Sequence, residues 1–367
     1  MHFSTRSIIT AAAFLILSAL PAIAANWDRG VSMYNKGDFR GALAEFQEIV
    51  RERPDAAGAW YYIGLCEFKL NRYKRVDLPL SHAIDLLGVQ SPASTNIEGA
   101  WYTIGFSHYL LADYAGAIDP LLRYRELAAK GGRSVDPNAT RALARAYFFL
   151  ERYDEALPLL AANPPNSAPA ETNTDFYYQG LIYFKRGDDD RAIASLQEAV
   201  KAKADDAAAL ELLANSLMRR ARKGNSKADW LRAADAGEKL LAVRDDLKTA
   251  NLLGLAYLGG GQFDKAVAPF EKLAKANRDD GQAWLYYGIS LSRSGSVRKA
   301  MEALEITIQI TPDSIPALSE LAYVYESDKQ YQQALRVYEK AYAASGSNDP
   351  SIKQSIDRVR ALASQQQ

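Results

Sequence analysis

The side chains best suited to catalysis in this 367-residue sequence are Ser107, His108 and Cys66. Ser107 and His108 are neighbours in the run GFSHY at 105–109. A nucleophilic serine of this kind needs a tight strand-to-helix turn with two glycines, whereas this run has one glycine and follows a helical pattern. Cys66 occupies a small, apolar position and is predicted to be an inert buried thiol rather than a redox sensor. The sequence therefore indicates no enzyme.

Metal sites are equally poorly supported. Three consecutive acids, Asp188 to Asp190, resemble the start of a calcium loop, but no glycine follows at the sixth place and no glutamate at the twelfth. They are predicted to form a solvated turn between helices. The sequence has one cysteine and three histidines, one of which is His2, so a zinc site or a disulfide framework is not expected. We expect neither a metal nor a cofactor.

Charge and the N-terminal segment narrow the class of protein further. The 44 basic and 44 acidic residues cancel, so nothing attracts a phosphate backbone and nucleic acid is disfavoured as a partner. Residues 1–24 have the layout of a cleavable signal peptide: Arg6, an apolar run from Ile8 to Leu20, and small residues before a cut after Ala24. The run is too short to span a bilayer. We expect an exported chain, periplasmic in a Gram-negative bacterium or secreted, without a transmembrane segment in its mature form.

An internal period of about 34 residues runs through the rest of the chain. Trp60 and Gly64 recur as Trp101 and Gly105. With Gly or Ala at the eighth place, nine repeats start at residues 23, 57, 98, 137, 173, 207, 247, 281 and 315. The twentieth place is Ala in eight of them, with seven inserted residues allowed in repeat six, and is Val76 in repeat two. Apolar residues follow helical spacing twice in each repeat, which predicts two helices, A and B, joined by a turn.

This pattern resembles the tetratricopeptide repeat of exported bacterial proteins. The family's Trp, small residue, aromatic and Ala occur in order, and Pro54 and Pro312 stand at its final proline. The resemblance implies an all-α, right-handed superhelical solenoid of about nine helix-turn-helix units. After repeat nine, Asp349 and Pro350 begin a helix with one apolar stripe, which is predicted to cap the open end. The stripe consists of Ile352, Ile356, Val359 and Leu362.

The same alignment predicts the domain boundaries and two local features. Repeats one to four occupy 25–162, a proline-rich linker 163–172, repeats five to nine 173–348, and the capping helix with its tail 349–367. His108 stands at the eleventh place, where four other repeats have tyrosine, so it is predicted to replace a packing aromatic. The insertion in repeat six is predicted to be a turn from Ala221 to Lys227, with basic residues from Arg219 onward. Two readings of this turn stay open, a solvated mobile segment and a docking point for an anionic partner.

The family resemblance implies that places 5, 9, 12 and 13 of helix A face a concave groove. In repeats two to five these places are rich in aromatic residues and include two arginines one helical turn apart, a composition typical of protein-binding hot spots. About half of such aromatics are expected to pack between helices instead. The candidate partner-binding residues are Tyr61, Tyr102, Phe106, Arg141, Arg145, Tyr177 and Lys185.

Two functions fit this surface. The first is a non-catalytic periplasmic scaffold or adaptor that binds an extended peptide or a helix of a partner protein. The alternative is an accessory protein for an envelope glycan, either peptidoglycan or an exported polysaccharide, whose sugar rings would stack on the tyrosines of the same groove. The sequence does not identify the partner.

Overall fold

The computed structural model describes residues 26–161 and 169–365, so the predicted signal peptide at 1–24 lies outside the described residues. Within these ranges the chain forms 19 α-helices and one short 3-10 helix, and it has no strand. The helices group into two compact units, an N-terminal unit that ends at Ala146 and a C-terminal unit that begins at Tyr147. This division falls inside one helix, α7 (Pro137–Phe149).

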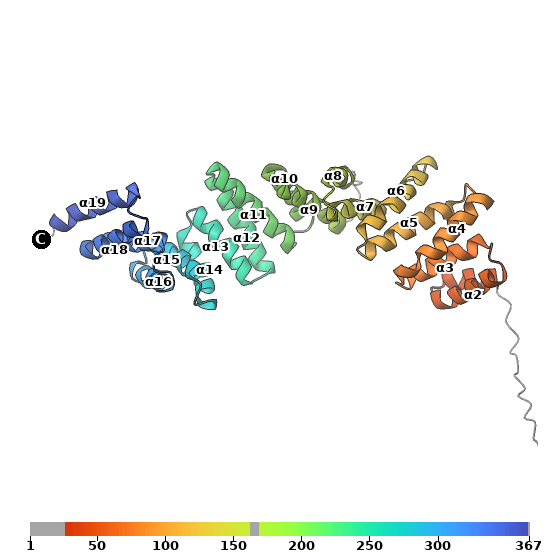
Figure 1. Ribbon diagram of the computed structural model, residues 1–367, viewed down its shortest axis with the longest axis horizontal. Helices are drawn as coiled ribbons and strands as arrows, with labels where there is room; N and C mark the ends of the chain where they lie inside the picture. The colour runs from red at the N-terminus through yellow and green to blue at the C-terminus, as the bar shows by residue number, and fades with distance from the viewer. Residues whose placement is uncertain (1–25, 162–168, 366–367) are drawn as a thin grey trace, which may run out of the picture. The chain divides into compact units, whose positions relative to one another are not determined.

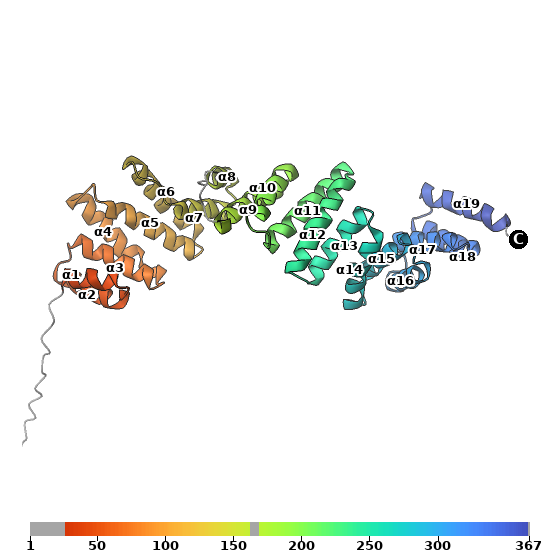
Figure 2. The ribbon, with the colours of Figure 1, turned by 180° about the vertical axis from the view of Figure 1, so that it is seen from behind.

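In the N-terminal unit each helix packs against the next one along the chain (Figure 1). Figure 2 shows α1 beside α2 at the start of this series. The helices are α1 (Trp27–Asn35), α2 (Phe39–Glu52), α3 (Ala57–Lys69), the 3-10 helix η1 (Tyr73–Arg75), α4 (Asp77–Gln90), α5 (Thr95–Leu110) and α6 (Tyr114–Lys130), followed by the first part of α7.

The C-terminal unit repeats the arrangement and ends in a single helix. Its helices are α8 (Tyr153–Ala161), α9 (Pro169–Lys185), α10 (Asp189–Ala202), α11 (Ala207–Gly224), α12 (Lys227–Val243), α13 (Leu247–Gly259), α14 (Phe263–Ala276), α15 (Gly281–Arg293), α16 (Val297–Ile310), α17 (Ile315–Ser327), α18 (Tyr331–Ala344) and α19 (Pro350–Gln365). Since α9 begins at Pro169, the last four residues of the predicted linker are helical. Residues 163–168 lie outside the described part, and the linker itself stays a prediction.

The predicted fold class is confirmed. Nine successive helix pairs, α1/α2 to α17/α18, precede α19, and the predicted repeat starts at 57, 207, 247, 281 and 315 coincide with the first residues of α3, α11, α13, α15 and α17. The capping helix is also confirmed, because Ile352, Ile356 and Val359 of α19 are buried against α17 and α18. The Asp349 carboxylate accepts hydrogen bonds from two backbone N–H groups in its first turn.

The two helices of a pair cross at the eighth place of helix A. In six repeats this place is glycine, and a large side chain of helix B occupies the space that a Cβ would need, with its nearest atom at 3.0 Å or closer. The contacts are Gly30–Phe46, Gly64–Leu80, Gly105–Leu121, Gly180–Leu196, Gly254–Phe270 and Gly288–Leu304. In every case the large residue stands sixteen positions after the glycine. The residues at the twentieth place, Val76 included, are all 0% exposed, so both small-residue positions lie inside a close helix crossing.

Repeat six corrects one prediction. The seven inserted residues lengthen both helices, since α11 has 18 residues and α12 has 17, whereas α13 and α14 of the next repeat have 13 and 14. Only Asn225 and Ser226 separate α11 from α12, so the predicted turn from Ala221 to Lys227 is wrong. Asn225 has φ 48°, in the left-handed region that ends helices. The inserted residues extend the helical pattern instead of interrupting it.

Three of the basic residues of this segment form ion pairs within the protein: Arg219, Arg220 and Lys223. Asp189 is 6% exposed and accepts from Arg219 and, at 2.8 Å, from Lys223. Arg220 donates to Asp190 at 2.7 Å and to Asp229 at 2.6 Å. The prediction of a solvated turn is therefore wrong for Asp189, which is buried, whereas Asp188 lies in the turn between helices and caps α10, and Asp190 is exposed.

His108 occupies the position at which other repeats have a packing tyrosine, as predicted. Like two of these tyrosines, it also forms a hydrogen bond with helix B of the preceding repeat. Tyr257 and Tyr325, at the same place, donate to Glu238 and Glu305 on helix B of the preceding repeat. His108 Nε2 lies 2.7 Å from Asp77 of α4, also on the preceding helix B, and Nδ1 lies 2.7 Å from Asp113. Burial lowers the His108 pKa, but hydrogen bonds and charge from these carboxylates outweigh it, so the pKa is raised above its ordinary 6.5.

The close crossing predicts opposite effects for two Gly→Ala substitutions. Alanine normally stabilises a helix relative to glycine by roughly 0.5–1 kcal/mol. Gly64→Ala should instead lower the free energy of unfolding by about 1–3 kcal/mol, because its methyl group would overlap Leu80. Gly88→Ala, in the exposed part of α4 where nothing lies within 4 Å of a Cβ, is the matched control and should be stabilising. Urea denaturation of both variants measures the difference, and equal effects would contradict the crossing contact.

The His108 contacts predict a pH-dependent stability. Because its pKa is raised by folding, the stabilisation is complete below about pH 6.5 and is lost as the pH rises through the folded-state value. Solvent screening keeps it below about 1 kcal/mol. His108→Tyr preserves the packing and should remove this pH dependence between about pH 6 and 8. Thermal melts of the two proteins across that range test this, and identical pH profiles would contradict it.

Candidate functional site

Four aromatic side chains form a row in the N-terminal unit. The rings of Tyr102 and Phe106 are stacked with centroids 5.6 Å apart and an interplanar angle of 8°. Phe106 also contacts Phe68 of α3, at 6.3 Å, and Tyr109, at 5.8 Å. The Tyr109 hydroxyl accepts a hydrogen bond of 3.4 Å from Arg145. The structure thus brings together three of the predicted site residues, Tyr102, Phe106 and Arg145.

This row is partly buried, which limits what it can present to a partner. Burial and the nearby Asp136 and Tyr124 raise the pKa of Tyr102 to about 12. Tyr61 is also partly buried, and its hydroxyl fills the space beside Gly99. Arg141 is 6% exposed, so the prediction that it projects into a groove is wrong. Its spacing of four from Arg145 correctly places both residues on one helix. The burial of Arg141 depends on neighbouring helices, so the spacing could not predict it.

The two remaining predicted residues lie in the C-terminal unit. Tyr177 of α9 packs against the buried core around α10 and α11 and contacts Tyr178 with ring centroids 5.7 Å apart. Lys185, the last residue of α9, is exposed. Five of the predicted residues thus lie in the N-terminal unit, where Tyr102 and Phe106 belong to the aromatic row and Arg145 contacts it, and two lie in the C-terminal unit.

A cavity of about 460 Å³ lies on the helix-A side of repeats eight and nine. Ile289 and Arg293 of α15 and Ser319 and Tyr323 of α17 line it at places 9, 13, 5 and 9 of their repeats, which the family resemblance assigns to the groove. The remaining lining residues are Pro316, Glu320, Tyr338, Ser351, Ile352, Ser355 and Arg358. The cap helix α19 thus supplies one wall.

The cavity combines an exposed aromatic ring with two arginines and three serines. Tyr323 is 40% exposed, and the Arg293 guanidinium lies 4.6 Å from the centre of its ring. Arg293 also donates to Glu320 at 2.8 Å. Arg358 of α19 makes two 2.8 Å hydrogen bonds to Glu326. These ion pairs hold the guanidinium groups in fixed positions at the edge of the cavity, where their remaining N–H groups can bind an acceptor.

Sequence reasoning missed this cavity because it ranked the repeats by their aromatic content. The groove places of repeats eight and nine have a single tyrosine, Tyr323, and so ranked below those of repeats two to five. The same places could have identified Ile289, Arg293 and Ser319. No signal in the sequence could show that α19 lies close enough to close the cavity.

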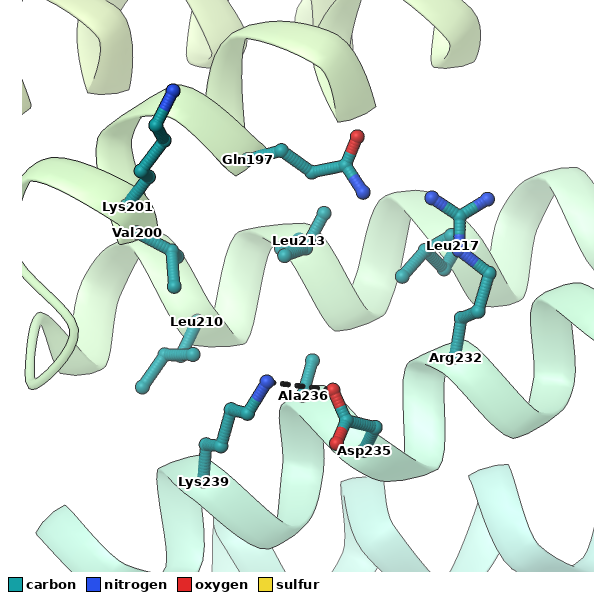
Figure 3. A pocket seen from close by; sticks show the side chains of 10 residues that line it. All are labelled: Gln197, Val200, Lys201, Leu210, Leu213, Leu217, Arg232, Asp235, Ala236 and Lys239. Atoms are coloured by element: carbon teal, nitrogen blue, oxygen red, sulfur yellow. Dashed lines mark hydrogen bonds and ion pairs between the residues drawn. The ribbon is translucent and has the colours of Figure 1, made fainter.

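A second cavity, of about 290 Å³, lies between helices α10 and α12 (Figure 3). Its apolar floor is formed by three leucines of α11, of which none is more than 7% exposed. Its three cations are each paired within the protein: Lys201 with Glu198, Arg232 with Asp229, and Lys239 with Asp235. This cavity therefore offers little accessible apolar surface and no uncompensated charge.

The side chains first considered for catalysis have structural roles. The Ser107 hydroxyl is buried and donates to the Thr103 carbonyl at 2.7 Å, so it bonds the backbone of its own helix rather than His108. Cys66 is buried as predicted, and burial raises the pKa of its thiol to about 12. Among the described residues, no helix is both long and apolar enough to cross a membrane.

Comparisons with known proteins agree with the repeat pattern. Family models described as tetratricopeptide repeat match residues 28–75 and 251–315, residues 176–202, and residues 317–350. Tetratricopeptide repeat protein 37 of Xenopus laevis is 25% identical in an alignment of 195 positions that covers 48% of this chain. The chain spans only 11% of the length of that relative.

Solved structures with a similar fold include a MamA double mutant, which is 19% identical to this chain. The match covers 48% of this chain and 96% of that chain and has a TM-score of 0.42. YrrB, described as a TPR protein with an unusual peptide-binding site, has 17% identity, covers 50% of this chain and 91% of its own, and has a TM-score of 0.44. The TPR domain of P58(IPK) covers 93% of this chain and 98% of its own, with 17% identity and a TM-score of 0.31. Together with the nine helix pairs and their small-residue crossings, the family-model matches show that this chain is a tetratricopeptide-repeat protein.

Proposed function

We propose that the protein is a non-catalytic scaffold that binds a peptide or a helix of a partner protein, and that its main site is the cavity of repeats eight and nine. Tetratricopeptide repeats serve generally in protein interactions. The observation that carries the proposal is the exposed ring of Tyr323 beside Arg293, in a cavity on the helix-A side. Exposed aromatics and arginines in a concave surface have the composition of binding hot spots.

The lining residues suit an extended or helical segment of a protein. An apolar side chain of the partner can lie on Tyr323 and Ile289, which lie at the same place of successive repeats. The serine hydroxyls and the unused N–H groups of the arginines can donate to backbone carbonyls or to a carboxylate of the partner. Since Arg293 and Arg358 are already fixed by glutamates, little side-chain entropy is lost when they bind.

The glycan alternative depended on tyrosine faces open to solvent. Tyr102 is stacked on Phe106 and meets the edge of Tyr124, with ring centroids 5.2 Å apart, so its ring is largely used for packing. Tyr61 and Tyr177 are also partly buried. This packing removes the observation that favoured sugar stacking, so the proposal keeps a protein partner.

We also propose that the chain acts after export, in the periplasm of a Gram-negative bacterium or outside the cell. The support is the sequence of residues 1–24, with its short apolar run and small residues before Ala25. The proposed scaffold would then serve envelope or secreted proteins.

Substitution at the cavity tests the binding site. A peptide selected on the full chain from a displayed library of random peptides serves as the probe. Tyr323→Ala should weaken its binding by about tenfold or more, because the exposed ring is lost, while the melting temperature changes little. Tyr331→Ala is the matched control, since Tyr331 belongs to the same repeat but does not line the cavity. Fluorescence polarisation and thermal melts give the two readouts.

Other outcomes of the same experiment are equally informative. If Tyr102→Ala weakens binding without unfolding the protein and Tyr323→Ala does not, the main site lies in repeats two to five, as the sequence predicted. If the library yields no peptide and the chain instead binds purified peptidoglycan, the scaffold proposal is wrong.

The export proposal predicts the mature N-terminus. When the full sequence is expressed in a Gram-negative host with an intact secretion pathway, intact-mass measurement of the protein from the periplasmic fraction should give a chain that begins at Ala25. Ala22→Asp and Ala24→Asp should block the cut. A cytoplasmic protein of full length would contradict the proposal.

A further inference from the structure

The turn between α3 and α4 in repeat two concentrates positive charge. Lys69, Arg72, Lys74 and Arg75 fall within seven residues, and no acid occurs between Glu67 and Asp77. This turn differs from the basic end of α11, where Asp189, Asp190 and Asp229 pair with three of the cations, as described above.

Most of this charge has no partner among the described residues. Arg72 lies 3.4 Å from Glu67, and Asp77 is engaged by His108 at 2.7 Å. Within the part of the chain that the structure covers, no carboxylate lies within ion-pair distance of Lys69, Lys74 or Arg75. All three side chains belong to exposed residues. An anion that approaches this turn therefore meets charge that is not already compensated.

The turn leads into helix B through the 3-10 helix η1. Position 16 of the repeat caps helix B, and in repeats one, three and five it is an aspartate: Asp38, Asp113 and Asp188 each accept a backbone N–H. In repeat two this position is Arg72, which makes no capping hydrogen bond, and the chain passes through the 3-10 helix η1 before α4 begins. Repeat four also has an arginine, Arg152, at this position, but η1 is the only 3-10 helix among the described residues.

A cavity of about 350 Å³ opens beside these cations. Asn71 to Arg75 form one side, and Leu111, at the end of α5, forms the other. Leu111 is 39% exposed, so the cavity has an accessible apolar wall. Tyr73 is held by a 2.7 Å hydrogen bond to Asn71, whose φ of 58° makes the tight turn. A cavity of this size, at the lower end of ligand sites, suits a single side chain of a partner.

We propose that this turn is a second docking site, which binds an acidic segment of a partner protein through one apolar side chain flanked by carboxylates. The apolar side chain packs on Leu111 inside the cavity, and the carboxylates accept from Lys74 and Arg75, which line it, and from Lys69 at the end of α3. The concave shape favours an inserted side chain over a flat lipid surface. Three uncompensated cations are also too few for firm binding of a nucleic acid backbone. The site is independent of the cavity in repeats eight and nine.

The test uses the full chain and a fluorescent synthetic peptide with glutamates on both sides of one leucine. Polarisation should show saturable binding that weakens with added salt. Lys74→Glu with Arg75→Glu should weaken binding by at least about tenfold. Arg336→Glu with Lys340→Glu is the matched control: it makes the same change in net charge at two exposed cations of α18 and should have less than about a twofold effect.

Two further variants separate the cavity from the charge. Leu111→Ser, or serine in place of the peptide's leucine, should weaken binding while leaving its salt dependence unchanged. A peptide with lysines in place of glutamates should bind the Lys74→Glu, Arg75→Glu variant better than the wild type, and a cooperative thermal melt shows that this variant is folded.

Several results would overturn the proposal. Equal losses in the test and control variants would indicate general electrostatic attraction. Unchanged binding after Leu111→Ser would remove the cavity from the site. Tighter binding of phosphatidylglycerol vesicles or of single-stranded DNA that depends on the same two residues would show that the turn serves a membrane or a nucleic acid instead of a protein.

Discussion

Close approach of helix A and helix B in each pair is the constraint on which the rest of the structure depends. A glycine or alanine of helix A receives a leucine, phenylalanine or tyrosine of helix B in most repeats, as Gly64 receives Leu80. Repeat six has Ala214 and Gly237 at the two positions, so both partners are small there. The contact fixes which side of helix A turns inward. Places 5, 9 and 13 are consequently presented in the same direction by successive helices, as Ile289 and Tyr323 illustrate at the cavity of repeats eight and nine.

Because each repeat packs mainly against its neighbours, the surface can change from repeat to repeat without disturbing the crossings. Repeat six uses this freedom to lengthen two helices, and Asp189 neutralises the charge this adds. Repeat two keeps the positive charge of Lys69, Lys74 and Arg75 open to solvent. The fold therefore supplies a regular frame, and the charges and cavities that distinguish one repeat from another determine what it binds.

The sequence predicts the helix pairs well, because the residues that determine each pair lie close together in the chain. Small residues at two fixed places and apolar residues at helical spacing predict the nine helix pairs and the capping helix. The burial of Ile352 and Ile356 follows from their spacing alone. The prediction of a turn in repeat six was wrong because the extra residues of the repeat were assigned to the connection between its helices, whereas the segment keeps its helical spacing through Met218 and Ala221.

The candidate site was less predictable because exposure depends on residues far apart in the sequence. Tyr102 and Phe106 stand at groove places but stack on each other, and Arg141 is buried. The cavity at Tyr323 needs Arg358 and Ile352 from α19, which follow about thirty residues later in the chain. No local sequence pattern shows that these residues lie close to Tyr323 in space.

Binding of the partner on the helix-A surface of repeats eight and nine, closed by α19, can be tested on the whole chain at once. Hydrogen-exchange mass spectrometry of the full chain, with and without a library-selected peptide, is the most direct measurement, since backbone protection is followed on every helix. We expect added protection in α15, α17 and the first turns of α19, with little change in α16. Protection confined to α3 and α5, or to the helix-B segments, would contradict this placement of the site.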